Sequence, residues 1–119
     1  TGCALTRPTV NVPVQSTAEE QYQFAQRYHR NRQIGVITDA KKYRMEREIV
    51  IATYDKVAEY FPEDRQATPL ARLDAIKMRI GFDLALETDR AFGSRRAHTA
   101  ALREGIGLLN DLISDYPEN

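Results

Sequence analysis

Apolar residues recur at every third or fourth position in four stretches of this chain, and each stretch predicts an amphipathic helix. The four predicted helices cover residues 17–32, 39–61, 69–91 and 95–116. The third stretch differs from the others because it carries two apolar stripes on different sides. A helix that is apolar on two sides is normally covered on two sides, so we expect the third helix in the middle of the packing.

Short polar residues stand before each stretch, where a helix start needs a side chain to cap its free N–H groups. The expected caps are Ser16 or Thr17, Thr38 or Asp39, Thr68 followed by Pro69, and Ser94. Pro62 ends the second helix, since the residue before a proline avoids the helical conformation. The links after the second and third helices are short, which makes neighbouring helices antiparallel.

A short motif recurs near the ends of the second and fourth helices. The chain reads "YFPED" at 60–64 and "DYPEN" at 115–119, an offset of 55 residues. The same offset aligns Tyr54 with Leu109, Val57 with Leu112, Phe61 with Tyr116, and Pro62 with Pro117. We therefore predict two helix pairs, each ending with an aromatic residue that packs back onto its pair.

Composition and charge support this all-α prediction and narrow the possible partners. The chain has 119 residues, of which 17 are basic and 17 acidic, so that its net charge is zero. A chain with no net charge has no overall field to attract nucleic acid, and we expect no nucleic-acid partner. No apolar stretch approaches the length of about 18 residues that a membrane-spanning helix needs.

The first 16 residues contain no helical pattern and include Cys3, the single cysteine of the chain. A lone cysteine excludes an internal disulfide, and it could be an ordinary, unreactive residue near a terminus. However, Thr1, Gly2 and Cys3 resemble the end of a bacterial lipobox, which implies a lipid on Cys3. In that family the mature protein begins at the cysteine, whereas two residues precede it here. Segment 4–16 contains two prolines and predicts an extended tether that reaches about 40 Å.

Residues 52–78, "ATYDKVAEYFPEDRQATPLARLDAIKM", resemble the tetratricopeptide-type repeats of bacterial outer-membrane lipoproteins, among them the lipoprotein subunit of the β-barrel assembly machine. The matching positions in the two copies are Val50, Tyr54, Val57 and Pro62, and Gly105, Leu109, Leu112 and Pro117. The repeat length of 55 exceeds the usual value of about 34, and the Trp-Leu-Gly-Tyr signature of a first helix is absent. The resemblance implies a protein-binding scaffold of helix pairs, anchored by lipid to the outer membrane and facing the periplasm.

Residue patterns that would carry catalysis or bind a metal are not found in the sequence. The two histidines, His29 and His98, are preceded at the third position by Gln26 and Arg95, whereas di-iron bundles place a glutamate there. The chain has no glycine-rich phosphate loop and no serine or cysteine in a recognisable nucleophile motif. We therefore expect no catalytic residue, no metal and no cofactor.

Two kinds of surface residue are candidates for binding a partner. The aromatic residues of the first helix exceed what one core stripe needs, so that two of them could form an exposed anchor instead of packing in the core. Basic segment 27–32 either complements the negative end of its helix or contacts an acidic partner face. Basic segment 94–98 lies at a helix start, where positive charge is unfavourable, which favours the contact. The candidate partner-binding residues are Phe24, Tyr28, Arg30, Arg32, Arg95 and Arg96.

The sequence thus predicts an all-α protein with a tether at 1–16 and a helical domain at 17–119, built as four antiparallel helices in two tetratricopeptide-like pairs. The predicted function is that of a non-catalytic cell-envelope lipoprotein. It would bind protein subunits of a membrane complex as a scaffold or accessory subunit, and the membrane through Cys3. The alternative is a stand-alone helical bundle that binds a small ligand or cofactor in its core.

Overall fold

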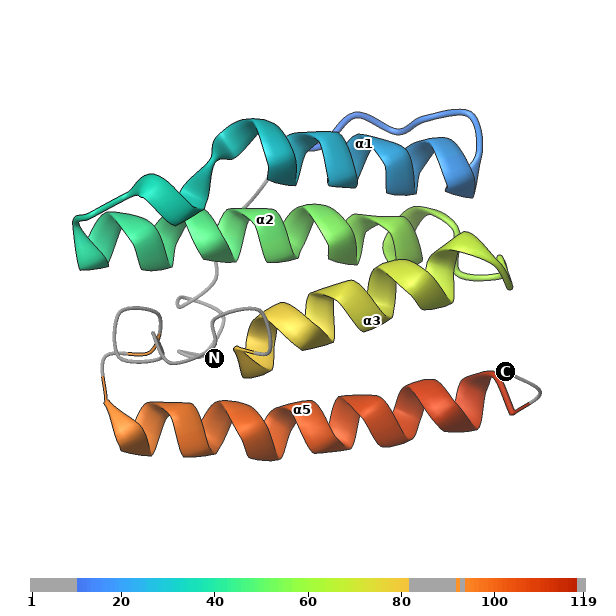
Figure 1. Cartoon of the computed structure of the whole chain (residues 1–119). Helices are drawn as coiled ribbons and strands as arrows, with labels where there is room; N and C mark the ends of the chain where they lie inside the picture. The colour runs from blue at the N-terminus through green and yellow to red at the C-terminus, as the bar shows by residue number, and fades with distance from the viewer. Residues whose placement is uncertain (1–10, 82–91, 93, 118–119) are drawn as a thin grey trace.

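The computed structural model describes residues 11–81, 92 and 94–117, and this part of the chain holds four α-helices, one 3-10 turn and no strand. The elements are α1 (Ala18–Arg32), the turn η2 (Ile34–Val36), α2 (Ala40–Tyr60), α3 (Ala67–Ile80) and α5 (Arg95–Asp115). Successive helices run in opposite directions and lie in the order α1, α2, α3, α5 from one side of the molecule to the other (Figure 1). The predicted all-α, antiparallel architecture is confirmed.

Three of the helices begin at the capping residues that the sequence predicts. The side-chain oxygen of Thr17 accepts a hydrogen bond from the backbone N–H of Glu20 at 3.1 Å. Asp39 caps α2 and Ser94 caps α5 in the same way. Each cap satisfies one of the N–H groups that the first turn of a helix leaves without a partner.

Helix α3 departs from the prediction at both ends. It starts at Ala67, and its free N–H groups are bound by Asp64 rather than by Thr68, because the Asp64 carboxylate accepts from the N–H groups of residues 66–68 at 2.6–3.0 Å. It ends at Ile80, because Gly81 adopts the left-handed conformation with φ of 80°. The predicted range of 69–91 is therefore wrong within the described residues, and positions 82–91 lie outside them.

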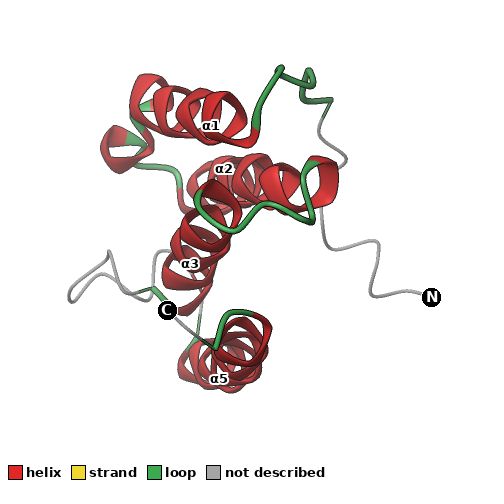
Figure 2. Ribbon diagram, turned by 90° about the vertical axis from the view of Figure 1, so that its right-hand side faces the viewer, coloured by secondary structure: helices red, strands yellow, loops and turns green. Residues whose placement is uncertain are grey.

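The core lies between the first three helices. Helix α3 packs most extensively on α2, and it also contacts α5 and α1, so its predicted central position is confirmed. Viewed along the helices, α3 lies between α2 and α5 (Figure 2). The main buried cluster contains Ala25, Ile34, Tyr43, Val50, Ile51, Tyr54, Val57, Ala71, Ala75 and Met78.

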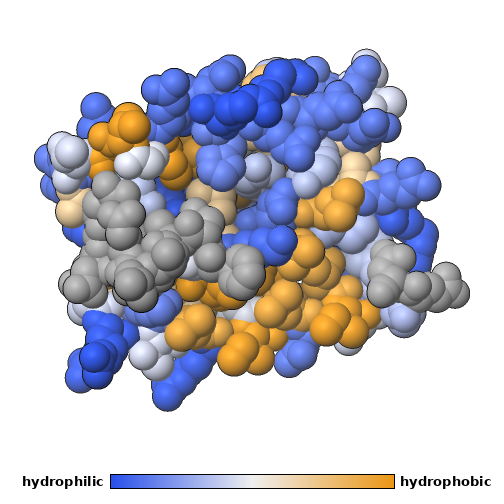
Figure 3. Space-filling model, viewed as in Figure 1, coloured by the Kyte–Doolittle hydropathy of each residue, from blue (hydrophilic) through white to orange (hydrophobic). Residues whose placement is uncertain are grey.

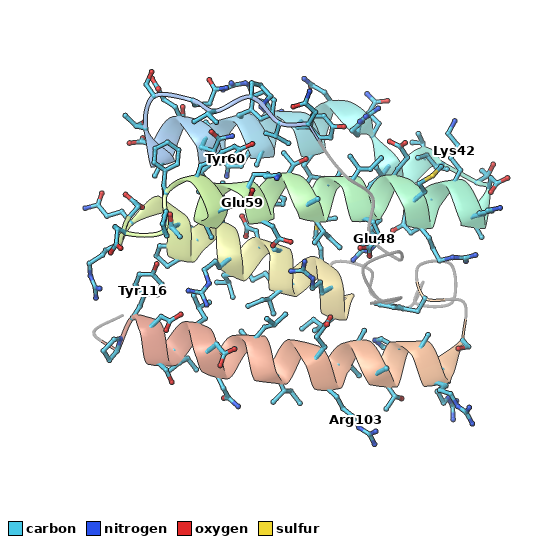
Figure 4. The ribbon with its side chains drawn as sticks, turned by 180° about the vertical axis from the view of Figure 1, so that it is seen from behind. Lys42, Glu48, Glu59, Tyr60, Arg103 and Tyr116 are labelled. Atoms are coloured by element: carbon cyan, nitrogen blue, oxygen red, sulfur yellow. The ribbon has the colours of Figure 1, made fainter. Side chains whose placement is uncertain are left out.

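The end of the predicted tether lies against the helices. Val12 is buried, and its carbonyl accepts a hydrogen bond of 2.6 Å from the hydroxyl of Tyr60, at the end of α2 (Figure 4). The buried side chain of Gln21 accepts from the N–H of Gln15 at 2.7 Å and donates to the carbonyl of Pro13 at 3.1 Å. Residues 12–15 are thus attached to both α1 and α2, whereas Cys3 lies outside the described residues.

Helices α2 and α5 repeat one another in structure as well as in sequence. Both contain 21 residues, and each residue of one aligns with a residue of the other at the offset of 55. Their C-terminal caps, Phe61 and Tyr116, have nearly equal φ and ψ angles, −132° and 62° against −133° and 66°. Both cap N–H groups donate to the carbonyl four residues before them. The predicted equivalence of the second helix of each pair is therefore confirmed, whereas α1 and α3 do not align at this offset, because 18–32 would correspond to 73–87 and α3 covers Ala67–Ile80.

Candidate functional site

Of the seven large apolar residues that are exposed in the described part of the chain, three lie on α5. Leu102, Ile106 and Ile113 stand on one side of this helix and are exposed, and Gly105 is its single buried residue. In the space-filling view, apolar side chains gather along α5 and continue onto the adjoining edge of α3 (Figure 3). A contiguous apolar patch of this kind marks a binding surface more often than isolated exposed residues do.

A groove of about 560 Å³ runs between α3 and α5 within this surface. Pro69, Leu70 and Leu73 line it from α3. Leu109, Leu112 and Ile113 line it from α5, with Tyr116 and Pro117 at one end. The groove lining is therefore mostly aliphatic, and two helices define its walls.

Tyr116 lies at one end of the groove. Its buried hydroxyl donates to the carbonyl of Asp64 at 3.1 Å, which ties the end of α5 to the loop before α3 (Figure 4). The guanidinium groups of Arg65 and Arg72 lie 5.3 Å and 5.8 Å from the centre of its ring. Arg72 also pairs with Asp115 at 2.8 Å. Arg65 therefore adds positive charge at this end of the groove.

Gly105 sets how closely α5 approaches α3. A Cβ atom placed on Gly105 would lie 2.1 Å from the Cγ2 methyl of Ile80, whereas one on Gly107 would meet nothing within 4 Å. The close neighbour at Gly105 is therefore a side chain of α3, whereas the space beside Gly107 is open.

The aromatic and basic candidates of α1 interact with one another. Phe24 stacks on Tyr28 with ring centres 6.3 Å apart, and the guanidinium of Arg32 lies 4.7 Å from the centre of the Tyr28 ring. Arg32 also hydrogen-bonds the Tyr28 hydroxyl and pairs with Glu46 of α2 at 3.5 Å. Tyr28 is half-buried and packs on the core. These residues thus join α1 to α2, and their role in binding a partner stays a prediction.

The remaining basic candidates are exposed but do not form one patch with the aromatic residues. Arg30 lies near the end of α1, whereas Arg95 and Arg96 lie at the start of α5. These two helices occupy opposite sides of the molecule, with α2 and α3 between them (Figures 1 and 2). The structure therefore divides the six predicted partner-binding residues between two separate regions.

Polar residues between α1, α2 and α3 form contacts that hold these helices together. The hydroxyl of Tyr22 donates to Asp74 at 2.5 Å, and His29 shares a hydrogen bond of 3.1 Å with the hydroxyl of Tyr54. Burial and the nearby charge of Asp74 raise the pKa of Tyr54 to about 12, although Arg30 acts in the opposite direction. The pKa of Tyr22 is raised further than that of Tyr54, mainly by burial and to a smaller extent by the hydrogen bond to Asp74. Both tyrosines therefore stay neutral at physiological pH.

The two histidines take part in ordinary packing. His29 stands edge-on to the ring of Tyr54, and His98 stacks on Phe92 and lies 3.2 Å from the carbonyl of Ile80. Within residues 11–81, 92 and 94–117, no group of three or more histidine, cysteine, aspartate or glutamate side chains is arranged to hold a metal ion.

The groove is not predicted by the sequence analysis, although the apolar pattern of α5 that forms one wall can be seen in the sequence. The pattern that placed α3 in the middle of the packing, apolar residues on two sides, also occurs in α5. Ala101, Gly105 and Leu112 form the side toward α3, and the exposed stripe lies beside them. The buried Arg47 was also missed, since nothing in its neighbours distinguishes it from the exposed cations of α2.

No protein-family model, curated protein or solved structure matches this chain. The resemblance to tetratricopeptide-type lipoproteins therefore stays a prediction that depends on the quoted residues. Among the described residues, no helix has the length and hydropathy needed to cross a membrane.

Proposed function

We propose that this chain is a non-catalytic scaffold that binds a partner protein through the groove between α3 and α5. The observation that supports this proposal is the apolar stripe of α5, which a monomer leaves open to water although it continues into a lined groove. Burial of apolar area contributes about 25 cal/mol per Å², so a partner that covers this surface gains stability that the free chain lacks.

A small apolar ligand in the groove is a second candidate, because the groove volume of about 560 Å³ is typical of small-molecule sites. However, Leu102 and Ile106 lie further along α5, beyond the residues that line the groove. A small ligand would leave them exposed, whereas a protein partner would cover both. The extent of the stripe therefore favours a protein.

The proposed partner is a protein subunit of a membrane complex in the bacterial cell envelope. The support for this location is the lipobox-like order of Thr1, Gly2 and Cys3 and the tetratricopeptide-type pattern of segment 52–78. A lipid on Cys3 would keep the domain at the membrane surface, on the periplasmic side of the outer membrane. Confinement to a surface raises the local concentration of the scaffold around its partner.

Purification of the full-length gene product from membranes in mild detergent tests the proposal, with Ile106→Glu as the test variant. Met45→Glu is the matched control, because Met45 is also an exposed apolar residue, on α2 instead of α5. A stoichiometric protein that the wild type and the control retain, but that Ile106→Glu loses, supports binding along the exposed stripe of α5 that continues into the groove. Equal recovery with all three chains would refute it.

The same preparation tests the other predicted features. Intact mass shows whether Cys3 carries a lipid, and an unmodified cysteine would end the membrane proposal without affecting the groove. Tyr28→Ala and Arg95→Glu test the two regions named from sequence. Loss of the partner in either variant, with helicity unchanged, would add that region to the binding surface.

A further inference from the structure

We infer that the groove between α3 and α5 accepts an amphipathic helix of the partner, which lies against α5 as α3 lies against α2. This inference rests on the proposed function and names the kind of partner segment. Its basis is the internal repeat, since the same chain contains an equivalent surface that is already occupied.

The surface of α2 that α3 covers is defined by two contacts. The guanidinium of Arg47 donates to the carbonyl of Met78 in α3 at 2.5 Å, and Asp55 pairs with Arg79 of α3 at 2.5 Å. Ile51 lies midway between them, four residues from each, so it belongs to the same face of the helix. These three residues therefore mark the face of α2 that receives α3.

The equivalent residues of α5 mark the exposed stripe. The offset of 55 places Leu102, Ile106 and Asn110 at the positions of Arg47, Ile51 and Asp55. Ile51 is 2% exposed beneath α3, whereas Ile106 is 59% exposed. The same offset places Ile113, which is 66% exposed, at the position of Ala58. The open stripe of α5 is thus the counterpart of the face that α2 buries under a helix.

The substitutions between the two faces indicate the chemistry of the occupant. The charged groups that pair with α3, Arg47 and Asp55, are replaced in α5 by a leucine and an asparagine. The helix that fits α5 therefore needs no basic residue at the position of Arg79, and its contact face is more apolar than that of α3. The small residues Ala71 and Ala75, which are fully buried in α3, show the spacing that lets a helix approach closely.

The charge at the Tyr116 end of the groove sets the direction of the occupant. Helix α3 begins near the end of α2 and runs antiparallel to it, so the occupant would begin near Tyr116. Arg65 lies at that end beside the Tyr116 ring. An acidic residue in the first turn of the occupant would complement both the positive end of its own helix and Arg65. The partner segment is therefore an apolar amphipathic helix with an acidic start.

A peptide helix copied from this chain provides the probe. The peptide contains residues 63–80 with Arg79→Leu, so that it carries the acidic start and the buried face of α3 without the basic residue that pairs with Asp55, and a fluorophore reports its binding to the full chain by anisotropy. We expect saturable binding that Ile106→Glu and Ile113→Glu weaken by at least about tenfold, as loss of a central contact does. Met45→Glu should leave the affinity unchanged, and a peptide with Ala71→Glu and Ala75→Glu should not bind.

The inference would be wrong if the peptide showed no saturable binding, or if it bound the Ile106→Glu chain as tightly as the wild type. It would also be wrong if the wild type sedimented as a dimer that Ile106→Glu dissociates, because the occupant would then be a second copy of the chain. The membrane purification separates this inference from the proposed function. If Ile106→Glu loses a partner protein while the peptide fails to bind, the scaffold stands and the helical occupant does not.

Discussion

Helices α2 and α5 have the same length, equivalent caps and the same C-terminal geometry, yet they lie in different surroundings. Helix α2 packs on α1 and on α3, whereas the only extensive contact of α5 among the described elements is with α3. Seven residues of α2 are buried, and one residue of α5 is. Local sequence signals therefore set where each helix begins and ends, while its neighbours set how much of it is buried. Four sets of substitutions test these two contributions, the packing of the helices and the bonds at their ends and between them.

The largest expected effect comes from removing a buried side chain of α2 and its exposed counterpart of α5. Ile51→Ala should lower the free energy of unfolding by about 2–5 kcal/mol, because it leaves a cavity beneath α3. Ile106→Ala should change it by less than about 0.5 kcal/mol, since the side chain is mostly in water. Urea unfolding followed by circular dichroism measures both. Similar losses in the two variants would show that α5 is covered in solution.

The two glycines of α5 should respond in opposite directions to alanine. Gly105→Ala should destabilise the protein by about 1–3 kcal/mol, because its Cβ would overlap the Ile80 methyl. Gly107→Ala should stabilise it by up to about 1 kcal/mol, since alanine is the better helix former and the site is open. The midpoint of thermal unfolding should therefore fall in Gly105→Ala and rise in Gly107→Ala. Adding Ile80→Leu, which moves the branch away from Cβ, should restore part of the stability of Gly105→Ala. A gain of stability in Gly105→Ala alone would mean that α3 and α5 do not approach so closely.

Removal of the Asp64 cap should cost about 0.5–2 kcal/mol, because the Asp64→Ala chain leaves three N–H groups at the start of α3 without their acceptor. Burial by itself would raise the pKa of Asp64, but the hydrogen bonds from residues 68, 66 and 67 hold the pKa below its ordinary value. The carboxylate thus stabilises the fold above the unfolded pKa of about 4, and this contribution is lost as the pH falls.

Urea midpoints measured across the acid range test this pH dependence. The stability of the wild type should approach that of Asp64→Ala as the pH falls below about 4. Ser94→Ala is the control, because it removes a neutral cap from α5 and should give a difference that does not change over the same range. Parallel curves for the wild type and Asp64→Ala would contradict the role of the carboxylate.

Tyr54→Phe should lower the free energy of unfolding at neutral pH by about 0.5–1.5 kcal/mol, because it removes the hydrogen bond with His29. The raised pKa of Tyr54 adds an alkaline effect. A hydroxyl that keeps its proton in the folded state stabilises the fold below the unfolded pKa of about 10, and this stability is lost as the pH rises toward the folded value of about 12. The free energy of unfolding should therefore fall less steeply with rising alkaline pH in Tyr54→Phe than in the wild type. Tyr22, whose pKa is also raised, accounts for the fall that remains. An unchanged slope would exclude Tyr54 as its source.

Much of the fold could be read from the sequence because its signals are local. Thr17, Asp39 and Ser94 act as caps through bonds that span three residues, and the two proline motifs reveal the repeat. The errors concern α3, where two signals compete. Thr68 is a good cap by type, but Asp64 binds three N–H groups at once, and the hydroxyl of Thr68 donates to the carbonyl of Phe61 instead.

The candidate site could be predicted only in part, because it depends on contacts between distant residues. The sequence shows that α5 is apolar on two sides, but the absence of a second neighbour among the described elements is a property of the packing. The burial of Gln21 and Arg47 could not be predicted either, since the groups to which they hydrogen-bond lie 8 and 31 residues away in the sequence. The sequence shows which residues are aromatic or basic, but it does not show whether these residues face a partner or contact one another.

The attachment of Val12 to Tyr60 has a consequence for how far the domain could move on its proposed anchor. With the segment free through residue 16, the domain could search a hemisphere about 40 Å in radius. With Val12 fixed, nine residues span the distance from Cys3, and the radius falls to about 30 Å. The volume of the hemisphere then shrinks by roughly half, and the effective concentration seen by a neighbour in the membrane roughly doubles. If Cys3 carries the proposed lipid, the contacts of residues 12–15 with Tyr60 and Gln21 set the range over which the proposed scaffold reaches its partner.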